Sequence, residues 1–145
     1  GINKGETVLV ERENSSDLGS CTGTEFRPLA KSGDDPAFNY YECPVPIPDI
    51  FPKVISNSVN YAALGRRNDL LIDGDIENME GAAFFSVCNA LEVPFLELRT
   101  ISNFVGDKPQ DWIFEEAGER LAENLARLLD FINHEKVLYN KTFSL

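Results

Sequence analysis

Histidine is almost absent from this sequence, which contains only His134. A Ser-His-Asp or Cys-His catalytic site uses a histidine as its base, and a His-ligated metal centre draws on the same side chain. Neither G-x-x-x-x-G-K-[ST] nor G-x-G-x-x-G occurs, so the common phosphate- and dinucleotide-binding loops are also missing. The residue types that remain for chemistry are carboxylates, arginines, hydroxyls and amides.

Basic residues and cysteines are scarce as well. Lys and Arg total 13 against 24 Asp and Glu, and the net charge of −11 argues against nucleic acid or an anionic membrane as the main partner. The three cysteines form no C-x-x-C pair, so neither a zinc ribbon nor a disulfide framework is expected, and a reducing cytoplasm is the default compartment. No apolar run reaches about 18 residues, and the first residues include no initiator Met and do not resemble a signal peptide.

Hydrophobic periodicity predicts a single domain that alternates strands and helices, with 43% apolar residues to build its core. The expected elements are a strand at Glu6–Glu11, a loop at Asn14–Tyr40, a proline-rich segment at Cys43–Pro52, a strand at Val54–Val59, a short helix at Ala62–Leu71, a helix at Met79–Leu91, a strand at Phe95–Ile101, a loop at Asn103–Asp111, a helix at Trp112–Ile132 and a tail from His134. Such an order is typical of an α/β domain with a central sheet.

The predicted sheet suggests where a ligand would bind. Ligands of open α/β sheets usually lie at the carboxyl ends of the strands, which places Arg99, Thr100, Ser102 and Asn103 at the site. Trp112, Phe84 and Phe85 could be mistaken for residues that stack on a base. Helix-to-sheet packing explains them, so we expect these aromatic side chains in the core.

Two motifs in the stretch Glu77–Val105 carry a family resemblance: M-E-G-A-A-F and, further on, P-F-L-x-x-R-x-I-S-N. Together they resemble the purine nucleoside phosphorylase/nucleosidase superfamily, most closely its futalosine hydrolase branch, next to the 5′-methylthioadenosine/S-adenosylhomocysteine nucleosidases. Neither motif alone would be specific. Glu6–Gly19 resembles the family segment after the nucleoside-binding loop, and the resemblance is weak between Ser20 and Ile76.

The resemblance implies a three-layer α/β/α phosphorylase/hydrolase-like fold with a central mixed sheet, formed by residues 1–145 as one partial domain. The first half of the family's domain supplies further strands, a glycine-rich loop near the ribose and the carboxylate that activates water. Nothing in this sequence matches those elements. We therefore expect a domain that is incomplete at its N-terminus. It could be a truncated product, one piece of a split protein or a degenerate paralogue.

The resemblance assigns the ribose side of a nucleoside site to the first motif. Glu80 matches the carboxylate that accepts hydrogen bonds from both ribose hydroxyls, although an acid at a helix N-terminus also has a purely structural explanation. Met79 matches the residue that packs on the sugar face. Asn78 stands where related enzymes often carry a Glu. Tyr61 is a candidate for stacking on the purine.

The second motif is assigned the base and the catalytic end of the pocket. Asn103 matches the base-reading position, which is an Asp in the adenine-specific relatives; its amide offers a donor and an acceptor together and suits a 6-oxopurine such as hypoxanthine. Ser102 would orient that amide, and Arg99 resembles the arginine that organises the catalytic end. Each residue could also be structural, Asn103 as a turn residue and Arg99 as the partner of a surface acid.

The implied reaction is hydrolysis of the N-glycosidic bond of a purine nucleoside such as futalosine, without a metal or organic cofactor. Phosphorolysis is the enzymatic alternative, and a binding or scaffold subunit that has lost the chemistry is the other. The expected partners are a purine nucleoside or free base, together with a second copy of the chain or a partner that supplies the unmatched half. Nucleic acid and membranes are not expected partners.

Overall fold

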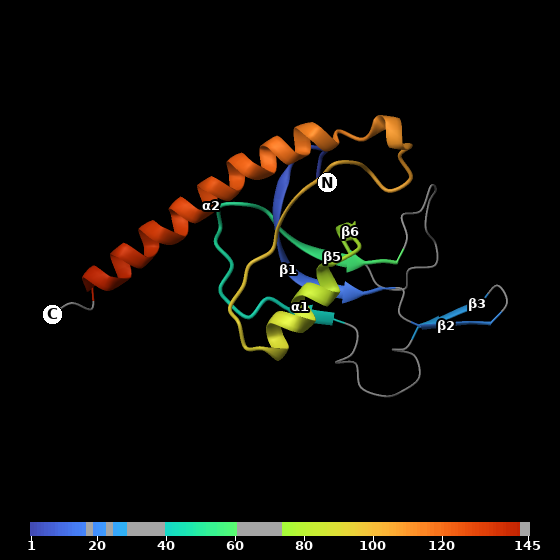
Figure 1. The fold of residues 1–145 in the computed structure, drawn as a ribbon, viewed down its shortest axis with the longest axis horizontal. Helices are drawn as coiled ribbons and strands as arrows, with labels where there is room; N and C mark the ends of the chain where they lie inside the picture. Colours follow the sequence, from blue (N-terminus) through green and yellow to red (C-terminus); the bar gives the residue numbers. More distant parts are fainter. Residues whose placement is uncertain (17–18, 23–24, 29–39, 61–73, 143–145) are drawn as a thin grey trace.

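The computed structural model describes residues 1–16, 19–22, 25–28, 40–60 and 74–142. Its elements are, in chain order, β1 (Thr7–Ser15), β2 (Gly19–Thr22), β3 (Glu25–Pro28), β4 (Tyr40–Glu42), β5 (Lys53–Ser58), β6 (Ile76–Asn78), α1 (Gly81–Ala90), β7 (Leu98–Thr100), the 3₁₀ turn η3 (Pro109–Asp111) and α2 (Phe114–Thr142). The expected helix at Ala62–Leu71 lies outside the described residues. Helices on a central sheet make this an α/β fold (Figure 1).

Strand β1 is the centre of the sheet. Its T-V-L-V start is buried on both faces, which is typical of a strand covered by helices on each side. Strand β5 pairs with β1 in parallel, and β6 pairs with β5 in parallel. On the other edge of β1, β7 and β4 pair antiparallel with its first and second halves. The sheet is therefore mixed, as the family resemblance implies.

A β-bulge interrupts β1 between Val10 and Arg12, where the pairing with β5 shifts by one residue. A bulge inserts one residue into the alternation of a strand and re-aims the side chains that follow it. Val8 and Val10 face α1, and the shift brings Glu13 onto the same face. The consequence is a buried carboxylate close to the N-terminus of α1.

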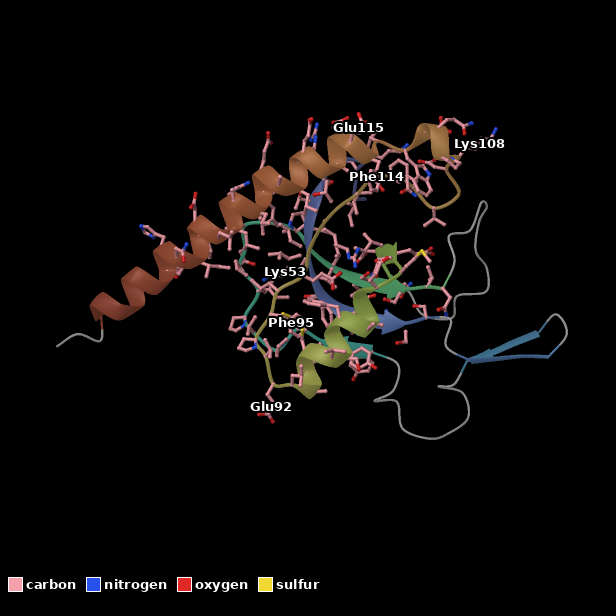
Figure 2. The ribbon with its side chains drawn as sticks, viewed as in Figure 1. Lys53, Glu92, Phe95, Lys108, Phe114 and Glu115 are labelled. Carbon is pink, nitrogen blue, oxygen red and sulfur yellow. The ribbon has the colours of Figure 1, made fainter. Side chains whose placement is uncertain are left out.

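The two faces of the sheet carry separate hydrophobic clusters. On one face α1 packs through Phe85, whose ring centroid lies 4.6 Å from that of Phe95; Figure 2 shows Phe95 beside this helix. On the other face α2 packs through Leu128 onto Leu9 and Phe51. Full burial of side chains of this size stabilises a fold by about 1.5–3 kcal/mol each. The result is the expected three-layer α/β/α arrangement (Figure 1).

Several sequence-based expectations need correction. The segment from His134 is not a loose tail, because α2 continues to Thr142 and runs on beyond the sheet (Figure 1). The predicted loop after Asn14 contains the last residues of β1 and the paired strands β2 and β3. The strong strand expected at Phe95–Ile101 is reduced to β7, since only three of its residues pair as a strand.

The three aromatic residues that were predicted to lie in the core differ in their burial. Phe85 is fully buried, as expected, whereas Phe84 is 40% exposed. Trp112 is half-buried, and its indole N–H donates to the carbonyl of Asp107. The core assignment is therefore wrong for Phe84, whose ring centroid lies 5.0 Å from that of Phe95 but stays at the exposed edge of this cluster.

Candidate functional site

A hollow of about 870 Å³ lies between the β6–α1 turn and the chain that passes through β7. The predicted site residues that line it are Asn78, Met79, Glu80, Arg99, Ser102 and Asn103. Tyr61 lies outside the described residues. Phe84 and Trp112 also contribute to the wall. The two sequence motifs, Met79–Phe84 and Pro94–Asn103, therefore meet at one surface.

The prediction that the second motif reaches the site at a shared carboxyl edge of the sheet was wrong. Strand β7 runs antiparallel to β1, so its carboxyl end lies at the opposite end of the sheet from those of β1, β5 and β6. A shared carboxyl edge does not bring Arg99 and Asn103 to the site. They reach it because the whole segment from Leu96 to Asp107 borders the hollow.

The turn that carries Met79 and Glu80 is held by Asn78. Its Oδ1 accepts hydrogen bonds from the N–H groups of Glu80 at 2.9 Å and Gly81 at 2.6 Å. The next free N–H of α1, on Ala82, donates to Ser58 Oγ at 2.7 Å. These bonds satisfy donors that a helix N-terminus otherwise leaves unpaired.

With the backbone of the turn fixed in this way, the two outer side chains stay available. Met79 is 54% exposed, and the Glu80 side chain is 75% exposed. The Glu80 carboxylate stands 3.7 Å from Arg99 Nη2, a distance at which an exposed ion pair contributes little to stability. It also accepts a hydrogen bond of 3.3 Å from the Met79 N–H, and because both contacts are exposed it can turn toward a ligand at small cost.

Behind the turn lies a buried polar cluster centred on Glu13, which is itself fully buried. Its Oε1 accepts hydrogen bonds from Ser58 Oγ at 2.7 Å and Asn78 Nδ2 at 2.8 Å, and Asn78 Nδ2 also donates to Ser56 Oγ. Burial raises the pKa of Glu13 by removing water from its charged form, although the hydrogen bonds from Ser58 and Asn78 oppose this shift.

Gly81 is the first residue of α1 and the point of closest approach to this cluster. A Cβ at this position would lie 2.5 Å from Glu13 Cδ and 2.6 Å from its Oε2. Only glycine leaves room for the carboxylate, which explains the glycine of the M-E-G motif in physical terms.

On the opposite wall, Arg99 is held by a second buried acid. Its Nε donates to Glu97 Oε1, and the Glu97 side chain is only 8% exposed. Since Arg99 also faces Glu80, one guanidinium lies between a buried and an exposed carboxylate. The buried partner fixes the base of the arginine and leaves its outer nitrogens toward the hollow.

Ser102 and Asn103 follow β7 and are partly buried. Ser102 Oγ donates to Asn103 Oδ1 at 2.7 Å, and Asn103 Nδ2 donates to the carbonyl of Phe104 at 3.2 Å. An amide NH₂ has two donors, so one of them remains free. Ser102 thus makes the contact that an orienting role requires, and Asn103 can still donate to a ligand.

The loop after Asn103 is tied to the N-terminal segment. Lys4 Nζ forms an ion pair with Asp107 at 2.7 Å and lies over the ring of Phe104. The hydrogen bond from Lys4, together with one from the Phe104 N–H, holds the pKa of Asp107 below its ordinary value. Thr7 and Thr100 share a further hydrogen bond at 2.7 Å, which joins β1 to β7.

Sequence reasoning missed Glu13 and Glu97. The sequence nevertheless contains a signal for each of these residues. Glu13 lies in V-L-V-E-R-E and Glu97 in F-L-E-L-R, and both segments have the pattern of a buried strand. Charged side chains are rarely buried unless they are paired, so an acid at such a position marks a polar cluster. Among the described residues no group of three or more His, Cys, Asp or Glu side chains is placed to hold a metal ion, and no helix is long and apolar enough to cross a membrane.

Comparison with known proteins places this geometry in context. The family model described as "Phosphorylase superfamily" matches residues 59–132. The chain is 34% identical to the futalosine hydrolase of Thermus thermophilus over 89% of its own length and 63% of that protein. The chain therefore spans less than two thirds of this relative.

Solved structures show the same fold at lower identity. The 5′-methylthioadenosine nucleosidase of Arabidopsis thaliana, in its apo form, is 19% identical with a TM-score of 0.61, over 92% of this chain and 56% of that one. A variant MTAN from Chlamydia trachomatis bound to MTA is 17% identical with a TM-score of 0.60, over 89% of this chain and 57% of that one.

Proposed function

The chain belongs to the phosphorylase superfamily, and we propose that its hollow binds the ribose and base of a purine nucleoside whose N-glycosidic bond the complete protein hydrolyses. The observation that carries this proposal is the meeting of Glu80 and Asn103 at one hollow of about 870 Å³. Pockets of roughly 300–1,000 Å³ take small molecules of nucleoside size.

Glu80 supplies the ribose contact. Its exposed carboxylate can accept one hydrogen bond from each of two neighbouring hydroxyls, and charge-assisted bonds of this kind are strong. Met79 is exposed beside it and offers an adaptable apolar surface to the sugar. As the bond to the base breaks, the ribose approaches an oxocarbenium ion. Hydroxyl contacts that strengthen in this transition state contribute several kcal/mol in glycoside hydrolysis.

Asn103 supplies the base contact. Because Ser102 donates to its Oδ1, the group left for the ligand is an Nδ2 donor. A 6-oxopurine presents two acceptors on the same edge, O6 and N7, whereas adenine presents a 6-amino donor beside N7. The site therefore favours hypoxanthine over adenine, as in futalosine. The donor would also stabilise negative charge on the departing base.

The water that attacks the anomeric carbon needs a general base. We propose that this base is a carboxylate that lies outside these 145 residues. General-base help contributes typically 10²–10⁴-fold. We expect these residues alone to hydrolyse no nucleoside at an enzymatic rate, and to pair with a second chain or a further segment that covers their exposed apolar side chains.

The test compares the purified 145-residue chain with the same chain co-expressed with the N-terminal half of a related enzyme. Each preparation is assayed with futalosine, inosine and methylthioadenosine, with and without phosphate. Turnover only in the mixture and without phosphate supports the proposal. Dependence on phosphate indicates phosphorolysis, robust turnover by the chain alone refutes the external base, and absence of both binding and turnover indicates a scaffold.

A further inference from the structure

The polar cluster behind the β6–α1 turn carries an inference that rests on the proposed function. We propose that Glu13 is a positioning residue for the ribose-binding carboxylate of Glu80. It acts through Asn78 and Ser58, which cap the first turn of α1, and does not touch the substrate.

The direction of the hydrogen bonds is the first argument. Glu13 Oε1 accepts from both Asn78 Nδ2 and Ser58 Oγ, so each neighbour must turn a donor toward it. Their acceptors then serve the backbone. Asn78 Oδ1 accepts from the N–H groups of Glu80 and Gly81, with a longer contact of 3.3 Å from Ser58 Oγ, and Ser58 Oγ accepts from the N–H of Ala82. One acceptor thus sets the polarity of both capping groups.

Burial is the second argument. Glu13 is fully buried, and Asn78 is 8% exposed. Taking a carboxyl group out of water is costly unless its hydrogen bonds are satisfied. An apolar side chain would fill the same space on the α1 face beside Val8 and Val10 without this cost. The cluster therefore stabilises one particular arrangement of the turn more than it stabilises the fold.

The bulge and the glycine are the third argument. The register shift after Val10 brings Glu13 to this face, and Gly81 leaves the space into which its carboxylate reaches. Two separate backbone features serve the same contact. Asn78 joins the two sites, since its Nδ2 donates to Glu13 and its Oδ1 accepts from the N–H groups of Glu80 and Gly81, so a shift of Glu13 reaches the backbone that carries the Glu80 carboxylate.

A reversal of the hydrogen bond between positions 13 and 78 tests the proposal. In Asn78→Asp the donor toward Glu13 is lost and two acids face each other, so the first turn of α1 should loosen. Adding Glu13→Gln restores a donor, now pointing from position 13 to position 78, while the carboxylate introduced at position 78 still offers an acceptor to the helix N-terminus. Glu11→Gln is the control, because Glu11 is exposed on the same strand.

The readouts are kinetics of the complete protein with futalosine and amide hydrogen exchange at Glu80, Gly81 and Ala82 without ligand. We expect N78D to lose on the order of 10²-fold in kcat/KM with a raised KM, and the double variant to recover at least about tenfold relative to N78D. E13Q alone keeps the Oε1 acceptor for Asn78 and Ser58, so its loss of kcat/KM should be smaller than that of N78D, and Glu11→Gln should match the parent. Loss of folded protein would instead lower the apparent kcat at unchanged KM.

Each outcome decides the matter. The role of Glu13 is overturned if the double variant has no higher kcat/KM than N78D. It is also overturned if N78D keeps the KM and the amide hydrogen exchange of the parent protein. If the parent protein neither binds nor cleaves nucleosides, the proposed function fails. The exchange data then still show whether Glu13 fixes the turn, and unchanged exchange in N78D would reject this part as well.

Discussion

The two walls of the hollow are built in different ways. The β6–α1 wall is fixed from behind by a buried network around Glu13, and its bonds reach the backbone of the turn directly. The β7 wall is held by Arg99 on Glu97 and by the Lys4–Asp107 ion pair, which is partly exposed. The difference teaches that the wall proposed to bind the ribose rests on a buried, shape-sensitive cluster, whereas the wall proposed to read the base rests partly on contacts that salt, pH and the N-terminal segment can influence.

The largest expected effect separates function from stability on the first wall. Glu80→Gln should lower kcat/KM of the complete protein by on the order of 10²-fold or more, because it weakens two charge-assisted bonds worth about 1.5–3 kcal/mol each. The free energy of unfolding should change little, since the Glu80 side chain is 75% exposed. Steady-state kinetics and denaturant unfolding measure the two quantities.

Glu92→Gln is the matched control, because Glu92 is exposed just after the C-terminal end of α1 (Figure 2). Full activity in E80Q, or unfolding of that variant, would make Glu80 a structural residue.

The second effect concerns the base on the other wall. Asn103→Asp keeps the acceptor for Ser102 but removes the Nδ2 donor that we propose for O6 and N7 of a 6-oxopurine. We expect the preference for hypoxanthine over adenine nucleosides to fall by about 1–3 kcal/mol, or roughly tenfold for each 1.4 kcal/mol. The measurement is the ratio of kcat/KM for futalosine to that for methylthioadenosine. An unchanged ratio, or equal values in the parent protein, would contradict base reading by Asn103.

The third effect tests the shape of the dry wall. Gly81→Ala places a Cβ 2.5 Å from Glu13 Cδ, and this carboxylate is fully buried with little room to move. Overpacking of this kind typically destabilises a protein by about 1–3 kcal/mol. Gly118→Ala is the control, because a Cβ at Gly118 meets nothing within 4 Å on an exposed face of α2. Equal stability of the two variants would show that the Glu13 cluster adjusts to the added Cβ without a loss of stability.

The sequence could predict the features that depend on local patterns, and it missed those that depend on long-range pairing between strands. The motif residues Glu80 and Asn103 lie on one hollow as expected, and α1 and β5 are close to their predicted bounds, whereas β1 runs past its predicted end at Glu11 to Ser15. The pattern V-L-V-E-R-E signals a buried acid but does not say that it is Glu13, because the bulge in β1 that brings Glu13 to the buried face is set by pairing with β5. The antiparallel direction of β7 was missed for a similar reason, since strand direction depends on its long-range pairing with β1.

The smallest effect is a difference in pH dependence between the walls. Burial raises the pKa of Glu13, so the folded state binds its proton more tightly than the unfolded state does. Its contribution to stability is fully present below the ordinary Glu pKa of about 4.3, and is lost as the pH rises through the folded pKa. The pKa of Asp107 is lowered, chiefly by Lys4. That contribution is present above about pH 3.9 and is lost as the pH falls through the folded pKa.

Removing each group should therefore change the pH profile of the unfolding free energy in opposite directions. For Glu13→Gln we expect stability to rise relative to the parent as the pH increases above about 4.3, because the cost of the buried charge is gone. For Lys4→Met the deficit relative to the parent should shrink as the pH falls below about 3.9, because acid already breaks the parent's ion pair. Denaturant unfolding between about pH 3 and pH 7 measures both profiles, with Glu11→Gln as the control for losing one negative charge. Parallel profiles for E13Q and K4M would show that the two walls do not differ in the way their hydrogen bonds and burial indicate.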